Sequence, residues 1–206
     1  MTHLFISSYL AGVQEPLRKF LAEKVKGEEH LLFISTAGNV ETYTGYIDEG
    51  KASLIALGYR LEYLDIAIEN EEDCLKKIEN AQGIVVSGGN TFYLLQELKK
   101  KQLLSAMCTK IARGCPYVGE SAGGIILAPS IAYVQLMDDP KQAPALTSYD
   151  GFKLIDFYPL PHHNEEPFKD IVDVIYRTYQ QELLLLPINN QQAIVVERGI
   201  HVIVGN

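Results

Sequence analysis

The chain has 206 residues, of which 47 % are hydrophobic and 21 % charged, a composition that indicates a soluble globular protein and excludes intrinsic disorder. This length predicts a single domain, residues 1–206, because domains usually hold about 100–200 residues. The 18 basic and 26 acidic residues give a net charge of −8, and the longest basic run, residues 99–101, is short, so nucleic acid is not an expected partner.

Strand-like and helix-like segments alternate through the first two thirds of the chain. Short apolar runs predict strands at residues 3–8, 30–36, 60–66, 83–87 and 115–120. Amphipathic segments predict helices at residues 14–26, 42–57, 70–80, 91–112 and from 121 onward. This βαβα succession predicts an α/β fold with a doubly wound parallel sheet beneath helices.

The last third has a different pattern. Residues 130–160 predict several short strands around a polar connection at 138–141. A helix is expected at about 166–182, followed by strands at 192–197 and 201–204 that a turn at 198–200 joins into a hairpin.

Neither the cysteines nor the N-terminus indicates export, a metal site or a membrane. The three cysteines are unevenly spaced and lack a C-x-x-C pair, which is typical of reduced thiols. The adjacent histidines at 162–163 lack the spacing of a metal motif. The N-terminal residues carry no basic segment, and their apolar run is too short for a signal peptide or a membrane helix. We therefore expect a cytoplasmic protein with no metal, no cofactor and no membrane contact.

A G-x-S-x-G pattern at residues 119–123 lies between a predicted buried strand and a predicted helix. There the glycines permit a tight turn that projects the Ser121 hydroxyl from the carboxyl edge of the sheet. The backbone N–H of Ala122, at the helix start, is then able to donate to an oxyanion. We interpret Ser121 as a nucleophile; the alternative is a glycine-rich turn in which the serine caps the helix.

A second glycine-rich turn, residues 87–91, ends the neighbouring predicted strand. Gly88 and Gly89 would let the backbone approach a substrate closely, as a second oxyanion donor or as a seat for a substrate carboxylate. The alternative is a tight turn capped by Asn90 or Thr91. Two such turns on one parallel sheet favour a shared site, because both would line the same edge.

A serine nucleophile needs a base with a pKa near neutrality, and histidine is the usual one. His162 and His163 follow a proline-flanked strand end, whereas the other three histidines lie in or beside apolar strands. A third residue would orient the imidazole. By residue type alone the candidates are Asp138, Asp139, Asp156, Glu165 and Glu197.

With these segments identified, the chain resembles the peptidase E family of serine peptidases, which includes aspartyl dipeptidases and more distant cyanophycinases. The resemblance runs nearly end to end, and three blocks carry it: VSGGNTFYLLQEL at 86–98, GESAGGIILAP at 119–129 and FYPLPHHNEEPF at 157–168. It implies a flavodoxin-like, class I glutaminase-like three-layer sandwich with a mainly parallel sheet and a C-terminal hairpin.

The resemblance also implies roles for individual residues. Ser121 matches the family nucleophile and His162, after Pro161, matches the base. Gly88, Gly89 and Asn90 match the oxyanion and substrate contacts. The third member is either Asp138, in a D-x-P step, or an acid near the start of a late strand, where this chain has glutamines at 191–192.

The function we expect is that of a serine exopeptidase, dipeptidase-like, that hydrolyses short peptides through an acyl-enzyme at Ser121. The alternatives are a small-molecule esterase or amidase and a non-catalytic ligand-binding protein. Aspartyl dipeptidases carry basic residues after the histidine, but residues 164–166 here are Asn-Glu-Glu, so an N-terminal residue other than aspartate is expected unless Lys169 or Arg177 substitutes. A homodimer is one option for the oligomeric state, which the sequence leaves open.

Overall fold

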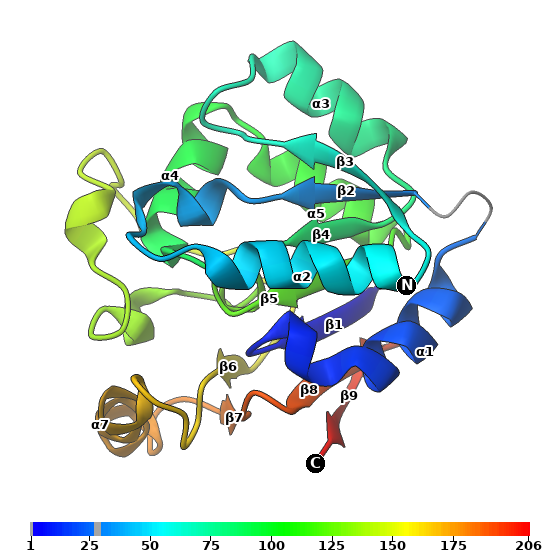
Figure 1. Ribbon diagram of the computed structural model, residues 1–206. Helices are drawn as coiled ribbons and strands as arrows, with labels where there is room; N and C mark the ends of the chain where they lie inside the picture. The colour runs from blue at the N-terminus through cyan, green and yellow to red at the C-terminus, as the bar shows by residue number, and fades with distance from the viewer. Residues whose placement is uncertain (1, 27–29) are drawn as a thin grey trace.

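The computed structural model describes residues 2–26 and 30–206, and the largest feature of this part of the chain is a seven-stranded sheet (Figure 1). The strand order is β3-β2-β4-β5-β1-β8-β9. The first five strands in this order are parallel, and β8 and β9 extend the β1 edge in antiparallel pairing. The strands of this sheet are β1 (His3–Ser7), β2 (His30–Ile34), β3 (Arg60–Leu64), β4 (Ile84–Val86), β5 (Tyr117–Glu120), β8 (Gln192–Glu197) and β9 (Ile200–Gly205).

Helices cover both faces of the sheet (Figure 1). Along β1, Leu4 and Ile6 join the core beneath one helical layer, whereas Phe5 joins the core beneath the other. This alternation explains the continuous apolar runs, since every side chain of a doubly covered strand is buried. The first layer holds α3 (Glu71–Asn80), α4 (Thr91–Lys100) and α5 (Leu104–Ala112), and the second holds α1 (Gln14–Lys24) and α2 (Gly45–Ala56).

The expected three-layer α/β sandwich with a mainly parallel sheet and a C-terminal hairpin is confirmed. The hairpin turn uses Arg198 and Gly199 at φ 53° and 78°, and two positive φ angles are typical of the type I′ turn that joins such strands. None of the helices within residues 2–26 and 30–206 combines the length and apolarity needed to cross a bilayer.

The prediction of a single helix at residues 91–112 is wrong, because the helix is broken at residues 101–103. Gln102 takes a left-handed conformation, φ 53°, and Leu103 N–H bonds to Leu98 O, so the chain ends α4 and begins α5 in a new direction. Before the break, α4 shares the core with strands β2 and β4, and after it α5 packs beside α3. A glycine would have marked this break in the sequence, and Gln102 did not.

The strands expected within residues 130–160 are also mostly wrong. This segment forms turns and short 3₁₀ helices, and only β6 (Tyr158–Leu160) is a strand. β6 pairs in parallel with β7 (Leu185–Pro187), which was not predicted, and α7 (Lys169–Tyr179) connects them. Apolar residues such as Phe152 and Phe157 of this segment pack into the core without joining the sheet, which accounts for their strand-like pattern.

Candidate active site

The carboxyl ends of three neighbouring strands define the candidate site. β4, β5 and β1 are adjacent and parallel, so the residues that follow them meet at one edge of the sheet. Gly88 follows β4, Ser121 follows β5 and Ser8 follows β1. Open α/β sheets bind ligands at this edge.

Ser121 lies on the turn between β5 and the short helix α6 (Ala122–Ile125), with φ 45° and ψ −106°. A positive φ is unfavourable for a serine, and the surrounding hydrogen bonds hold it: Ser121 N–H donates to Ser7 O at 2.8 Å, and Ser121 O accepts from Gly124 N–H at 2.8 Å. The flanking glycines are required by space. A Cβ on Gly119 would lie 2.4 Å from Gly123 O, and one on Gly123 would lie 2.3 Å from Val86 O.

Ser121 and His162 are in contact, with Ser121 Oγ 3.0 Å from His162 Nε2. The loop after β6 that carries His162 is anchored to β1, because His162 N–H donates to Ser8 Oγ at 3.1 Å and Ser8 Oγ–H donates to Ile188 O at 2.9 Å. The Phe168 ring stacks on the imidazole, with the centroids 4.6 Å apart and the planes at 23°. The backbone bond to Ser8 and the stacked ring of Phe168 together hold the imidazole in position.

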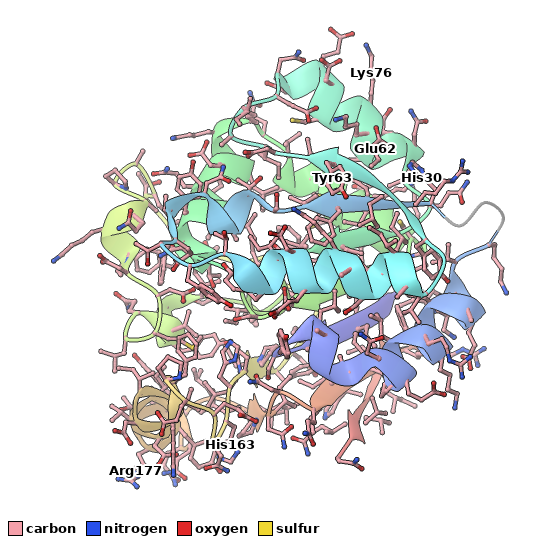
Figure 2. All side chains as sticks on the ribbon, in the orientation of Figure 1. His30, Glu62, Tyr63, Lys76, His163 and Arg177 are labelled. Carbon is pink, nitrogen blue, oxygen red and sulfur yellow. The ribbon has the colours of Figure 1, made fainter. Side chains whose placement is uncertain are left out.

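His163 takes no part in this contact. Its backbone N–H donates to Ile188 O at 3.0 Å, and its ring nitrogen Nδ1 lies 3.3 Å from the Asn164 side chain. In Figure 2, His163 lies low in the view, toward α7. Of the two adjacent histidines, the structure brings His162 to Ser121.

The residue beside the second imidazole nitrogen is Asn190, in the connection between β7 and β8. Its Oδ1 lies 3.1 Å from His162 Nδ1, and its backbone N–H donates to Glu165 Oε1 at 3.2 Å. With the amide oxygen as acceptor, Nδ1 carries the proton and the Nε2 lone pair accepts from the Ser121 hydroxyl. Sequence reasoning missed Asn190 because it considered acids; the position immediately before the glutamine pair was the available indication.

The structure does not bring Asp138 to the imidazole. The Asp138 carboxylate accepts hydrogen bonds from Thr91 N–H at 2.8 Å and from the Thr91 hydroxyl, at the start of α4. Neither glutamine at 191–192 has a hydrogen bond to the imidazole: Gln192 Oε1 accepts from Asn189 N–H, and Gln191 N–H donates to Asn189 Oδ1. The side chain in contact with Nδ1 is that of Asn190.

Burial lowers the pKa of His162 below its usual 6.5, while the hydrogen bond to Asn190 and the charge of Glu165 act in the opposite direction. The imidazole is therefore neutral at pH 7. A neutral imidazole with a free Nε2 lone pair is the form that accepts a proton.

The four expected oxyanion and substrate residues surround Ser121, but they differ in what their backbones offer. Gly88 N–H is already bound to Glu120 Oε2 at 3.2 Å, and Asn90 N–H is bound to Ala37 O at 2.8 Å. Gly89 N–H has no acceptor among the described residues, and Ala122 opens α6, where a helical N–H has no intrahelical partner. Gly89 and Ala122 are thus the two residues with N–H groups available to a substrate oxygen.

Glu120 is a second residue that sequence reasoning missed. It is 2 % exposed, directly precedes Ser121 and accepts hydrogen bonds from Leu10 N–H at 2.7 Å and Gly88 N–H. Burial raises its pKa to about 7, although both hydrogen bonds oppose that change. Glu120 therefore ties the turn that holds Gly88 to the turn that holds Ser121.

A cleft of about 610 Å³ opens over these residues. Its lining includes Ser121, His162, Asn190, Gly88 and Gly89. A larger groove, about 770 Å³, lies between α1 and the β8–β9 hairpin, and neither Ser121 nor His162 lines it. Across residues 2–26 and 30–206, no group of three or more His, Cys, Asp or Glu side chains could hold a metal ion.

A layered α/β fold with a serine and a histidine in contact at the sheet edge defines a class of serine hydrolases. Within that class, the sequence profile of peptidase family S51 matches residues 4–203 of the chain. The chain belongs to peptidase family S51 and is a peptide-bond hydrolase.

Relatives of known name agree with this assignment. The chain is 42 % identical over 203 residues to "Uncharacterized peptidase Lmo0363" of Listeria monocytogenes, covering 98 % of each chain. It is 34 % identical over 145 residues to "Peptidase E" of Salmonella heidelberg, covering 69 % of this chain and 58 % of that one. A crystal structure of a Listeria monocytogenes EGD-e protein named after peptidase E superposes with a TM-score of 0.92 and 40 % identity, over 100 % of this chain and 99 % of the other.

Proposed function

We propose that the chain is a serine exopeptidase that hydrolyses short peptides through an acyl-enzyme on Ser121. The observation that carries this proposal is the contact of Ser121 Oγ with His162 Nε2, backed by Asn190 on Nδ1. A cleft of about 610 Å³ has the size of a site for a small molecule, which suits a dipeptide better than a folded protein.

In the first half of the reaction, Ser121 Oγ attacks the carbonyl carbon of the scissile bond while His162 Nε2 takes the hydroxyl proton. The N–H groups of Gly89 and Ala122 donate to the oxyanion that forms. The C–N bond then breaks, and the imidazolium gives its proton to the leaving amine. The product that remains is an ester between the substrate acyl group and Ser121.

In the second half, a water molecule attacks the ester carbonyl while His162 Nε2 takes one of its protons. The bond to Ser121 Oγ breaks, the acid leaves, and the proton returns to Oγ. Asn190 holds the imidazole tautomer through both halves by accepting from Nδ1–H. Because its amide is uncharged, it orients the imidazolium with less electrostatic stabilisation than a carboxylate would give.

The test is a dipeptide panel assayed with the wild type, Ser121→Ala and, as a matched control, Ser105→Ala, an exposed serine on α5. We expect kcat/KM of Ser121→Ala to fall by about a thousandfold or more and that of Ser105→Ala to stay at the wild-type value. Hydrolysis of simple esters in preference to all peptides would favour a small-molecule esterase. Binding of dipeptides without turnover would favour a ligand-binding protein. The amide of Asn190 is the feature that supports this alternative, because it stabilises the imidazolium less than a carboxylate would.

We also infer that residues 1–206 form one domain located in the cytoplasm. The sheet takes strands from both ends of the chain, β1 and β9. All three cysteines are free thiols, two of them buried, which accords with a reducing compartment.

A further inference from the structure

The cleft over Ser121 is strongly acidic. Its carboxylates come from three separate loops and from the end of β5, and none of its described lining residues is a lysine or an arginine. Lys169 and Arg177, which could have supplied a positive charge, do not line it; Arg177 lies on the outer side of α7 in Figure 2, 4.0 Å from Asp173. The carboxylates that line the cleft are Glu41, Glu120, Asp138, Asp139 and Glu166.

These carboxylates differ in whether the protein itself satisfies them. Glu120 and Asp138 accept backbone N–H groups, and Asp139 Oδ1 accepts from Lys141 N–H at 3.0 Å. Glu41 is exposed at the mouth of the cleft, and its carboxylate, like that of Glu166, has no hydrogen bond or ion pair with any described residue. A carboxylate in this situation is available to a charged ligand.

Glu41, Asp138 and Tyr46 all line the cleft, and the part of it that they line is called the corner of the cleft below. Desolvation raises the pKa of Glu41. Burial and the charge of Glu41 raise the pKa of Asp138 to about 6, although the hydrogen bonds from Thr91 act in the opposite direction. The hydroxyl of Tyr46 is buried without a hydrogen-bond partner, and Glu41 and Asp138 both raise its pKa. Two carboxylates and a tyrosine whose hydroxyl has no hydrogen-bond partner thus line a part of the cleft without any lysine or arginine.

This corner is adjacent to the reacting serine. A Cβ placed on Gly88 would lie 3.3 Å from the Tyr46 ring and 3.5 Å from Ser121 Cβ, so Gly88 lies close to both side chains. Asn90 fixes the other wall, because its side-chain amide donates to Asp139 O at 3.1 Å. A residue whose carbonyl meets Ser121 therefore has its own substituents within reach of the corner.

We propose that Glu41, with Asp138 and Tyr46, binds a positively charged nitrogen of the substrate residue whose carbonyl Ser121 attacks, so that N-terminal aspartate is disfavoured and N-terminal lysine or arginine is favoured. This inference rests on the proposed peptidase function and specifies its substrate class. A cation placed beside the carboxylates of Glu41 and Asp138 gains charge-assisted hydrogen bonds, whereas an aspartate side chain there meets like charge.

The nitrogen has two sources, the side chain or the α-amino group, and the substrates separate them. Lys-Ala and norleucine-Ala differ in side-chain charge at similar length, Asp-Ala carries a shorter, negatively charged side chain, and α-N-acetyl-Lys-Ala has a neutral amide in place of the α-ammonium. The enzymes are the wild type, Glu41→Gln and the control Glu71→Gln, which removes an exposed carboxylate on α3 far from the cleft.

With the wild type we expect kcat/KM for Lys-Ala to exceed that for norleucine-Ala by about tenfold or more, and Asp-Ala to be the poorest substrate. Glu41→Gln should reduce the Lys-to-norleucine ratio by about tenfold, and Glu71→Gln should preserve it. Equal rates for Lys-Ala and norleucine-Ala that both fall in Glu41→Gln and on acetylation would assign the bound nitrogen to the α-amino group and would overturn the preference for lysine and arginine. Asp-Ala cleaved as fast as norleucine-Ala, or equal effects of Glu41→Gln and Glu71→Gln, would overturn the proposal.

A binding measurement separates failure of this inference from failure of the peptidase function. Calorimetry with Ser121→Ala should detect tighter binding of Lys-Ala than of norleucine-Ala, and the double variant Ser121→Ala/Glu41→Gln should lose the difference. That result would support the cation subsite even if no peptide were hydrolysed. If Lys-Ala and norleucine-Ala bound with the same affinity, and that affinity were the same in Ser121→Ala and in the double variant, the cation subsite would be overturned. If the wild type still hydrolysed peptides, the proposed peptidase function would stand.

Discussion

Asn190 Oδ1 lies 3.1 Å from His162 Nδ1, in the place that a carboxylate occupies in a serine–histidine–aspartate arrangement. The amide fixes the tautomer of the imidazole without adding a negative charge. The nearest compensation is Glu165, which accepts from Asn190 N–H at 3.2 Å and raises the pKa of His162. Asn190 thus orients the imidazole of His162, while the negative charge that favours the imidazolium comes from a different residue, Glu165.

The variant Asn190→Asp tests this separation. A carboxylate beside Nδ1 stabilises the imidazolium and raises the pKa of His162, so the acid limb of kcat/KM should move upward by about 1–3 pH units. In the wild type, burial lowers the pKa of His162, so kcat/KM is expected to fall on the acid side only below pH 6.5. Activity of the variant should therefore be lower than that of the wild type at pH 6.

Asn189→Asp is the matched control, because it adds the same charge at the adjacent residue, whose side chain contacts Gln191 and Asn206 instead of the imidazole. Its acid limb should move much less. Equal movement in both variants would mean that general charge, and not the contact with Nδ1, sets the pKa.

Glu120→Gln should change how stability depends on pH. Burial raises the pKa of Glu120 from 4.5 to about 7, so the folded state holds this proton more tightly than the unfolded state. Its contribution is fully present below pH 4.5 and is lost as pH rises through 7, a change of about 3 kcal/mol in the free energy of unfolding. Asp138 changes the free energy of unfolding with pH in the same direction as Glu120, and His162 changes it in the opposite direction. Both residues are present in the wild type and in Glu120→Gln, so their effects cancel when the two are compared.

Urea unfolding at pH 5 and pH 8 measures this effect. The difference in the free energy of unfolding, wild type minus Glu120→Gln, should be more positive at pH 5 than at pH 8. A difference independent of pH would show that Glu120 does not titrate in this range.

Gly89→Ala should be far more destabilising than Gly199→Ala. Both glycines have positive φ, 130° and 78°, but a Cβ on Gly89 would lie 2.3 Å from the Ala37 carbonyl, while one on Gly199 would have nothing within 4 Å. We expect a loss of about 2–6 kcal/mol for Gly89→Ala, from backbone strain and overpacking, and about 1–2 kcal/mol for Gly199→Ala. Denaturant melts measure both, and similar losses would mean that the close approach to Ala37 relaxes.

Much of the fold and part of the site could be predicted because the information is local. The glycines around Ser121 mark a turn that only small residues allow, and the apolar runs of β1, β2 and β4 reflect burial on both faces. Gln102 gave no such local indication, since its residue type does not predict a left-handed conformation that ends a helix.

The residues that were missed depend on tertiary structure. Asn190 reaches His162 only because the connection from β7 to β8 passes beside the β6 loop. Glu120 is a charged residue in a strand of four buried residues, and its partners, Leu10 and Gly88, lie far from it in the chain. No spacing rule relates these residues.

The most direct test of the account is the reaction of Ser121 with a fluorophosphonate, followed by intact mass and peptide mapping, in the wild type, His162→Ala and His163→Ala. We predict one label on Ser121 in the wild type, a large loss of labelling rate in His162→Ala and a nearly unchanged rate in His163→Ala, because only His162 Nε2 contacts Ser121 Oγ. Absence of labelling in the wild type, or loss in His163→Ala with retention in His162→Ala, would contradict the proposal that His162 activates Ser121.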